Sequence, residues 1–269
     1  YLLNYPTLRI FDFADVTTIQ WFKFFSVDAL HLIGIGILFL ILTRYISHLT
    51  GLNEFVMYIS AALIILLLTP YVLNNEWTDI TILPFTSYFT YNAGSFFPLF
   101  PWLFYIFAGG AFGFILRKYE INLQKPEFYL SVIGSGLILY LLPMILDSLY
   151  YNDFVSIDYF RTDVLLSIKR LGIVFILVGL ISFLLARSVR TPQVILSLGR
   201  NSLLIYIMHL ILIYGCVLIP GLTFIWKNNF SITITVLIAI TLTIIFSILS
   251  ILIDRKKLKI DKAGSEFSL

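Results

Sequence analysis

The sequence predicts an all-α membrane protein, a polytopic bundle of transmembrane helices. Only 12% of its 269 residues are charged, about half the share expected in a soluble domain. Apolar residues gather in runs of roughly 20, the length that an α-helix needs to cross the hydrocarbon core of a bilayer. No run alternates polar and apolar residues as a strand does, so helices are favoured over a β-barrel.

Seven runs are long enough to span a membrane. The second, fourth, fifth and seventh are predicted from length and composition, whereas the first, third and sixth also carry polar or small residues at defined spacings. The expected spans are 28–46, 55–73, 98–116, 129–146, 167–186, 202–219 and 231–252.

Basic residues set the expected orientation, because Lys and Arg are in excess in cytoplasmic segments. With the tail 253–269 placed inside, two thirds of the 18 Lys and Arg residues fall on the cytoplasmic side. The carboxyl terminus is therefore expected in the cytoplasm as a basic tail, and seven crossings place residue 1 outside.

The first span opens with VDALHLIGIG, in which Asp28 and His31 stand three positions apart. This spacing places both side chains on one face of a helix, at the outer interface. A carboxylate beside an imidazole fixes its tautomer and raises its basicity, an arrangement typical of a general base. Asp28 and His31 are therefore candidate catalytic residues; a surface pair where the helix leaves the membrane is the alternative.

The third span is preceded by FFPLFPW, and its two prolines, Pro98 and Pro101, are tolerated at a helix start. Trp102 is expected at the membrane interface and is a candidate substrate-binding residue. Gly109 and Gly113 stand four positions apart and predict a face on which another helix packs closely. A long, thin ligand is the alternative neighbour of this face.

The sixth span, in GRNSLLIYIMHLILIY, carries a histidine at the centre of an apolar helix. Ser202, Tyr206, His209 and Cys216 are expected on one stripe, separated by four, three and seven positions. Because polar side chains are costly in hydrocarbon, this stripe should face protein or a hydrated cavity. We therefore expect His209 to be catalytic and Tyr206 and Ser202 to bind substrate. Hydrogen bonding to a neighbouring helix is the alternative.

Arg200, Asn201 and Ser202 open the same helix at its cytoplasmic end. Asn201 or Ser202 is expected to cap the helix, and the forked guanidinium of Arg200 suits a phosphate. With the helix dipole they predict a site for an anionic cofactor. A helix cap beside an arginine of the positive-inside kind is the alternative.

Several other chemistries find no support in the sequence. The three histidines and one cysteine show no metal-ligand spacing, so no metal is expected. There is neither a glycine-rich phosphate-binding loop nor a G-x-S-x-G elbow. The net charge of +3 is small and is not a signal for nucleic acid.

Three stretches carry a family resemblance: VDALHLIGIGILFLIL (27–42), FFPLFPWLFYIFAGGAFG (96–113) and SLGRNSLLIYIMHLILIY (197–214). In this order they resemble the bacterial relatives of heparan-α-glucosaminide N-acetyltransferase, within a wider group of multi-span membrane acyltransferases. The resemblance implies an enzyme of the bacterial inner membrane that moves an acetyl group from cytosolic acetyl-CoA to an amine or hydroxyl of a sugar or glycan across the membrane. It puts His209 where thioester and acceptor meet, and Arg200 and Asn201 near the phosphorylated end of coenzyme A.

The chain also departs from this family. Members open with an arginine- and aspartate-containing span and an early histidine, and nothing similar precedes YLLNYP. We therefore expect 1–269 to be a single acyltransferase-like transmembrane domain that lacks amino-terminal spans and is inactive alone. A transporter or flippase for a polar or acylated molecule and a non-catalytic scaffold are the alternatives. The lipid bilayer is an expected partner in every case, and a homo-oligomer is left open.

Overall fold

The computed structural model describes residues 16–75, 82–149, 164–187, 191–216, 219–222 and 231–266. Contacts between Cα atoms divide the chain into two compact units. One unit comprises residues 17–187, and the other comprises residues 188–269 together with residues 1–16.

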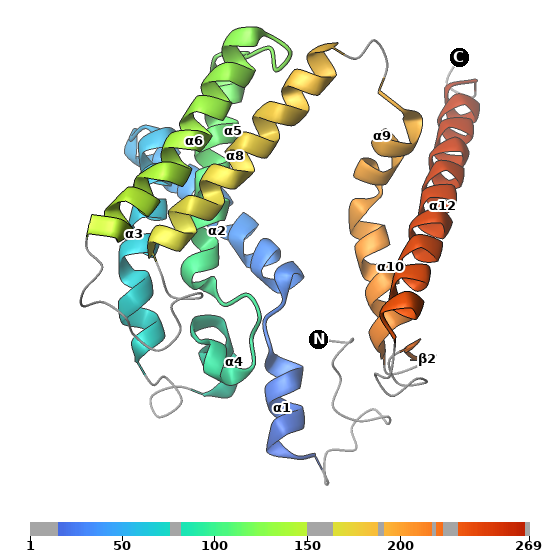
Figure 1. Cartoon of the computed structure of the whole chain (residues 1–269), viewed down its shortest axis with the longest axis horizontal. Helices are drawn as coiled ribbons and strands as arrows, with labels where there is room; N and C mark the ends of the chain where they lie inside the picture. Colours follow the sequence, from blue (N-terminus) through green and yellow to red (C-terminus); the bar gives the residue numbers. More distant parts are fainter. Residues whose placement is uncertain are drawn as a thin grey trace. The chain divides into compact units, whose positions relative to one another are not determined.

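Long apolar helices confirm the predicted class, an all-α polytopic bundle (Figure 1). Within the described residues, six helices are long and apolar enough to cross a membrane, and a bent pair of shorter helices raises the number to seven if it forms one span. The six agree with the predicted spans to within a few residues at most ends, and the last of them continues through much of the expected basic tail. They are α2 (Ala29–Thr50), α3 (Glu54–Asn74), α5 (Leu99–Lys118), α6 (Pro126–Leu149), α8 (Val164–Arg187) and α12 (Ile232–Glu266).

Local capping explains where the first helices of unit 17–187 begin. The short helix α1 (Thr18–Phe25) starts with a capping box between Thr17 and Gln20. Helix α2 starts at Asp28, whose carboxylate accepts hydrogen bonds from two backbone N–H groups of the first turn. Helix α2 ends at Gly51, which adopts the left-handed conformation (φ 71°), and Asn53 then caps α3.

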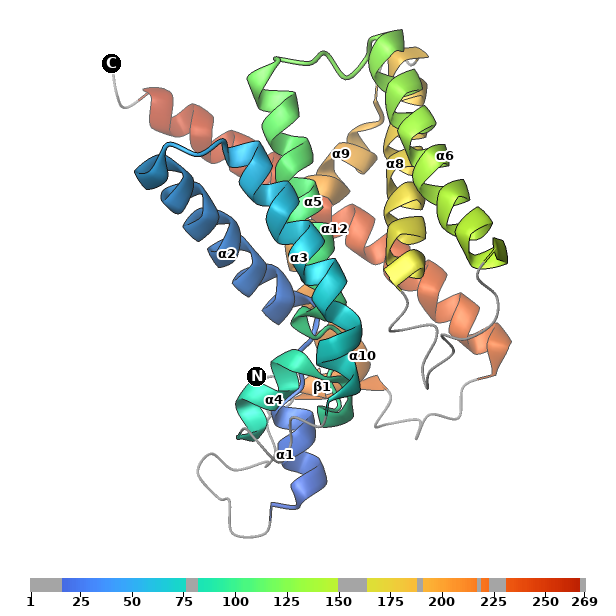
Figure 2. The same cartoon turned by 90° about the vertical axis from the view of Figure 1, so that its left-hand side faces the viewer.

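The main core of this unit lies between α3 and α5, with α2 packed on α5 (Figure 2). Two short elements, α4 (Leu83–Phe89) and the 3₁₀ helix η3 (Tyr91–Ala93), lead into α5. Pro98 occupies the N-cap position of α5, which agrees with the expected proline at a helix start. The buried core side chains include Tyr58, Ala62 and Leu66 of α3 and Leu103, Phe107 and Ala111 of α5.

Helices α6 and α8 lie side by side and touch through two glycines (Figures 1 and 2). A Cβ atom added to Gly136 would lie 2.8 Å from the carbonyl oxygen of Gly172 and 2.8 Å from the backbone nitrogen of Ile176. A Cβ atom on Gly172 would lie 2.7 Å from the carbonyl oxygen of Gly136. The two backbones are therefore in direct contact, as small residues allow in membrane helices.

The prediction that Gly109 and Gly113 form such a packing face is wrong for the part of the chain that the structure describes. A Cβ atom at either position would meet no atom within 4 Å. Neighbouring Gly110 faces Leu40 of α2 instead. The two glycines do stand four positions apart on one side of the helix, but the rotation of α5 about its axis turns another side toward α2 and α3.

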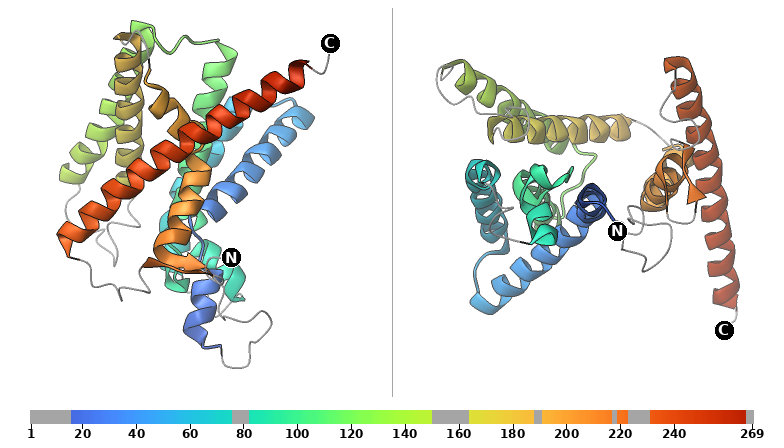
Figure 3. Two further views of the ribbon diagram at one scale, coloured as in Figure 1. Left: turned by 90° about the vertical axis from the view of Figure 1, so that its right-hand side faces the viewer. Right: turned by 90° about the horizontal axis from the view of Figure 1, so that it is seen from below.

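Unit 188–269 places two short helices along α12 (Figure 3). Helix α9 (Gln193–Arg200) and helix α10 (Ser202–Tyr214) meet at Asn201 with a bend of 73°. Helix α10 stops at Gly215, whose φ of 82° favours glycine. Two-residue strands β1 (Gly215–Cys216) and β2 (Ile219–Pro220) then pair antiparallel.

The predicted span 202–219 is therefore wrong in form. Helix α10 has 13 residues, which makes it about 20 Å long and too short to cross the roughly 30 Å hydrocarbon core by itself. Cys216 lies in β1 and does not continue the helical stripe of Ser202, Tyr206 and His209. The bend at Asn201 and the stop at Gly215 replace a straight span with a broken one.

Candidate functional site

The predicted pair of Asp28 and His31 forms at the amino terminus of α2. Atom Oδ1 of Asp28 lies 2.8 Å from Nδ1 of His31 and also accepts hydrogen bonds from the backbone N–H groups of Leu30 and His31, at 2.9 and 3.1 Å. Both side chains are largely but not fully covered, with exposed fractions of 25% for Asp28 and 18% for His31. The predicted shared helix face is confirmed, and one carboxylate serves as both helix cap and imidazole partner.

The 2.8 Å contact sets the protonation of the ring. The 2.8 Å contact with a carboxylate favours a proton on Nδ1 of His31 over the longer approach of the Asp28 backbone N–H to the same atom at 3.5 Å, and this tautomer carries the basic lone pair of the neutral ring on Nε2. Burial raises the pKa of Asp28, but hydrogen bonds from the His31 side chain and backbone and the attraction of the imidazole outweigh it, so this pKa lies below its ordinary value. Asp28 therefore stays ionised and holds the imidazole.

The chain just before α2 is fixed to the chain just before α5. The Val27 N–H donates to Oγ of Ser95 at 2.9 Å, and the same hydroxyl donates to the carbonyl of Ser87 at 2.6 Å. The N–H groups of Phe96 and Phe97 both donate to the Val27 carbonyl at 3.1 Å. Because Val27, Ser87 and Ser95 are buried, the start of α2 is held in one position relative to α5.

A pocket of about 360 Å³ lies between α2, α5 and α8, and His31 is not among the residues that line it. Leu32 and Ile33 of α2 line it, together with Trp102 and Tyr105 of α5 and Arg170 of α8. Trp102, predicted to bind substrate, is thus in the wall of a pocket. Its indole N–H donates to the Tyr91 hydroxyl at 2.9 Å, and the Arg170 guanidinium carbon lies 5.9 Å from the centre of its ring.

Arg170 is a candidate site residue that sequence reasoning missed. It was counted only as a charge on the outer side, although it falls inside the predicted span 167–186. An arginine within an apolar span is costly unless it faces protein or a cavity, and this was the signal that could have identified it. In the structure it lines the pocket beside Trp102 and Tyr105.

His209 makes its described contacts within its own helix. Its Nδ1 lies 3.1 Å from the carbonyl oxygen of Ile205, and its ring meets the Tyr206 ring edge-on with centroids 5.3 Å apart. His209 and Tyr206 are half-buried, and Ser202 is exposed. The three residues share the expected side of α10, but they line neither the pocket beside Trp102 nor a second pocket between Phe112 and Leu185.

Asn201 joins α9 to α12 through a buried polar cluster. Its side-chain N–H₂ lies 3.1 Å from the Ser197 carbonyl, 3.1 Å from Oγ of Ser250 and 3.0 Å from Oδ1 of Asp254. The hydroxyls of Ser197 and Ser250 are 2.7 Å apart. Arg200 extends from the edge of this cluster, with a guanidinium nitrogen 3.6 Å from Oδ2 of Asp254 and 66% of its side chain exposed.

The expected side-chain cap of α10 is wrong. Asn201 occupies the N-cap position, but neither it nor Ser202 makes a capping hydrogen bond. The Asn201 amide is only 4% exposed and its N–H₂ group donates to the cluster instead. Ser250 and Asp254 were missed because they were read as part of an apolar run and a basic tail, although their spacing of four puts them on one helix face.

The two sets of candidate residues belong to different units of the chain. Asp28, His31 and Trp102 lie in unit 17–187, whereas Arg200, Tyr206 and His209 lie in unit 188–269. Within the described segments, no group of three or more His, Cys, Asp or Glu side chains could hold a metal ion.

Fold and composition define an integral, multi-pass α-helical membrane protein. No protein-family model, curated protein or solved structure matches the chain.

Proposed function

We propose that the protein is a membrane-embedded acyltransferase, which moves an acetyl group from acetyl-CoA to an amine or hydroxyl of a sugar or glycan. The observation that carries the proposal is the Asp28–His31 pair, joined at 2.8 Å at the start of α2, the helix whose next residues, Leu32 and Ile33, line a pocket with Trp102 and Arg170. A carboxylate-oriented imidazole beside a pocket is the usual arrangement of a general base. The family resemblance of three sequence stretches supports the same reaction class.

In this mechanism Nε2 of His31 removes the proton from the acceptor hydroxyl or amine as that group attacks the thioester carbonyl. The new acyl–oxygen or acyl–nitrogen bond forms, the carbon–sulfur bond breaks, and the coenzyme A thiolate takes the proton back from the imidazolium. Asp28 stays ionised throughout and keeps the ring in one orientation. A two-step route through an acyl-histidine uses the same residues.

Aromatic and cationic side chains of the pocket suit a sugar acceptor. Trp102 offers an apolar ring face, and Tyr105 and Arg170 offer hydrogen-bond donors. Polar groups in small number within an apolar wall are typical of small-molecule pockets. The acceptor would therefore lie against Trp102, near the start of α2.

The donor side of the proposal rests on Arg200. Its guanidinium is largely exposed and can reach a phosphate of coenzyme A, while Asp254 limits how it moves. Asn201 acts by positioning Arg200, since its own amide is buried. His209 is kept as a candidate catalytic residue of unit 188–269, with Tyr206 against its ring.

The test is acetyl transfer by the full-length protein in lipid nanodiscs, followed by release of free coenzyme A and by mass spectrometry of a panel of amino and hydroxylated sugars. Replacing His31 by alanine should lower the rate about 10²–10⁴-fold. Replacing His48 by alanine is the matched control, because His48 lies on the same helix but is exposed in its last turn. Equal rates for the two variants would remove His31 from the mechanism.

A transporter or flippase is the second candidate, favoured by the broken span of α9 and α10 with its 73° bend. Discontinuous helices form many substrate sites in transporters. Movement of a labelled sugar or acylated molecule across a vesicle wall without acetyl-CoA would support transport. Coenzyme A release coupled to acceptor modification would support the transferase.

A further inference from the structure

Two neighbouring pockets in unit 17–187 share lining residues along α5 and α8. The first, of about 360 Å³, reaches from Arg170 and Trp102 to Phe112 and Val178. The second, of about 200 Å³, shares Phe112 and Val178 with the first and continues to Leu185. We call the two together the α5–α8 groove.

The groove follows one stripe of each helix. On α8 the lining residues recur every three or four positions, as one helix face requires. Between the first and last of them the helix rises on the order of 22 Å, which is most of the roughly 30 Å hydrocarbon thickness of a bilayer. The lining residues of α8 along this stripe include Arg170, Val174, Val178, Ile181 and Leu185.

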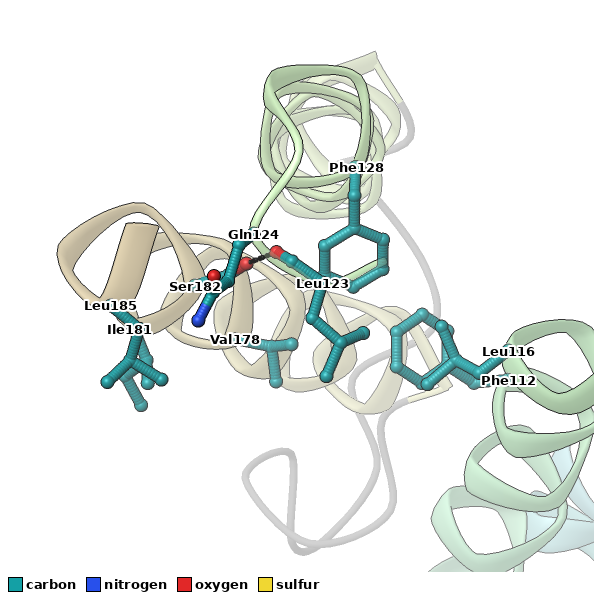
Figure 4. A pocket seen from close by; sticks show the side chains of 9 residues that line it. All are labelled: Phe112, Leu116, Leu123, Gln124, Phe128, Val178, Ile181, Ser182 and Leu185. Atoms are coloured by element: carbon teal, nitrogen blue, oxygen red, sulfur yellow. Dashed lines mark hydrogen bonds between the residues drawn. The ribbon is translucent and has the colours of Figure 1, made fainter. Parts of the chain in front are cut away.

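The two ends of the groove differ in chemistry. At the Leu185 end the wall is almost wholly apolar (Figure 4), and Ser182 there donates its hydroxyl to the Leu123 carbonyl. Figure 4 also shows the Leu123 side chain extending toward Phe112 beside Val178. At the other end lie the Arg170 guanidinium and the Tyr105 hydroxyl.

The Tyr105 hydroxyl is a second, independent sign of a ligand. Its oxygen is buried and no well-formed hydrogen bond reaches it within the described part of the chain; the Ser167 and Arg170 side chains are its neighbours for weaker hydrogen bonding. An unsatisfied buried hydroxyl is rare because it is costly. A polar group of a bound molecule at this end would supply the missing partner.

We propose that the α5–α8 groove binds a lipid with a phosphate headgroup, its phosphate at Arg170 and Tyr105 and one hydrocarbon chain along the apolar wall toward Leu185. A phosphate has enough oxygens to accept from both side chains, and a guanidinium has five donors, so Arg170 can hold it while keeping another partner. A free anion would leave the apolar length of the groove unused. A neutral lipid would gain no attraction from the charge of Arg170.

Gly109 gives a direct way to close the groove. It lines the wall, and a Cβ atom there would meet nothing within 4 Å among the described residues. Leucine at position 109 should therefore fill the groove without moving α5. Gly113, one turn further along α5, is equally open but lies outside both pockets, so Gly113→Leu is the matched control.

The experiment measures binding of single-chain lipids to the full-length protein in detergent by native mass spectrometry, with no acetyl donor present. Lysophosphatidic acid is the probe, and monoacylglycerol with the same chain and inorganic phosphate are the comparisons. Arg170→Ala should weaken binding of lysophosphatidic acid at least about tenfold. Lys169→Ala should not, because Lys169 lies over the Tyr140 ring and lines neither pocket.

Closing the groove should abolish the same binding, so Gly109→Leu should lose it while Gly113→Leu retains it. A photoreactive group near the end of the lipid chain should label the protein near Phe112 and Val178 in the wild type and not in Gly109→Leu. Labelling of the wild-type protein tests the proposal even if one variant folds poorly.

Three results would overturn the proposal: equal binding of monoacylglycerol, equal binding of inorganic phosphate, or equal loss in Arg170→Ala and Lys169→Ala. The first result would show that the phosphate charge is not needed for binding, and the second that the hydrocarbon chain is not needed. The third would show that Arg170 has no specific role in it. Occupation of the groove by another protein helix would appear as absence of labelling in the wild type and would also count against it. The lipid phosphate would occupy the end of the pocket that the proposed function gives to the sugar acceptor, so the two ligands would compete for it. Because binding is measured without acetyl transfer, failure of lipid binding and failure of the proposed enzyme activity can be told apart.

Discussion

Replacing Gly136 by alanine should loosen the packing of α6 against α8. The added methyl group would lie 2.8 Å from the Gly172 carbonyl oxygen and from the Ile176 nitrogen, and both are backbone atoms. Side chains cannot turn away to make room, so the two helices must separate by several tenths of an ångström. Overpacking of this kind costs about 1–3 kcal/mol.

Gly134 of the same helix provides the control, because a methyl group there would meet nothing within 4 Å among the described residues. Both substitutions replace a helical glycine by alanine and so gain the same conformational term of about 0.5–1 kcal/mol. The term cancels between them, and Gly136→Ala should be less stable than Gly134→Ala by about 1–3 kcal/mol.

Thermal unfolding in detergent, followed by size-exclusion chromatography with tryptophan fluorescence, measures this difference. A change of 1 kcal/mol shifts the midpoint by about 2–4 °C in a chain of this size class. Gly136→Ala should therefore melt several degrees below Gly134→Ala. Equal midpoints would refute the backbone contact between α6 and α8.

Two further predictions concern polar groups of the two units. Asp254→Ala should destabilise unit 188–269 by about 1–3 kcal/mol, because it removes a buried acceptor of Asn201 at 3.0 Å; Ser247→Ala, whose hydroxyl bonds only its own helix in the described residues, should have little effect on the unfolding midpoint. For Asp28, whose folded pKa lies below its ordinary value, the carboxylate stabilises the fold fully above about pH 4 and progressively less as pH falls through the folded pKa. Asp28→Asn keeps a capping side chain but does not titrate, so unfolding midpoints of wild type and variant should converge on acidification, and a constant gap would contradict this linkage.

The sequence predicted the elements well where their cause is local. A run of apolar residues must form a helix to satisfy its backbone in lipid, and six spans agree with the structure for this reason. The pair of Asp28 and His31 was predicted because three positions along a helix fix which side chains meet. The sixth span failed because the bend at Asn201 and the stop at Gly215 interrupt a sequence that remains apolar throughout.

The remaining features join residues that are distant in the chain. Arg170 meets Trp102 across two helices, and Asn201 meets Asp254 across 53 positions. No spacing rule along one helix connects such partners. The sequence therefore did not predict which residues Arg170 and Ser250 contact.

The sequence by itself determined that this is a multi-pass helical membrane protein, where its spans lie, and that a carboxylate and an imidazole meet at the start of the first. These properties follow from the length of each apolar run relative to the thickness of the bilayer, and from the number of residues per turn of one helix. The tertiary structure decided which glycines touch, how Asn201 and Asp254 pair, and that α5 and α8 enclose a groove with a cation at one end. Each of these depends on how helices rotate against one another, and that rotation is set by packing across the whole unit.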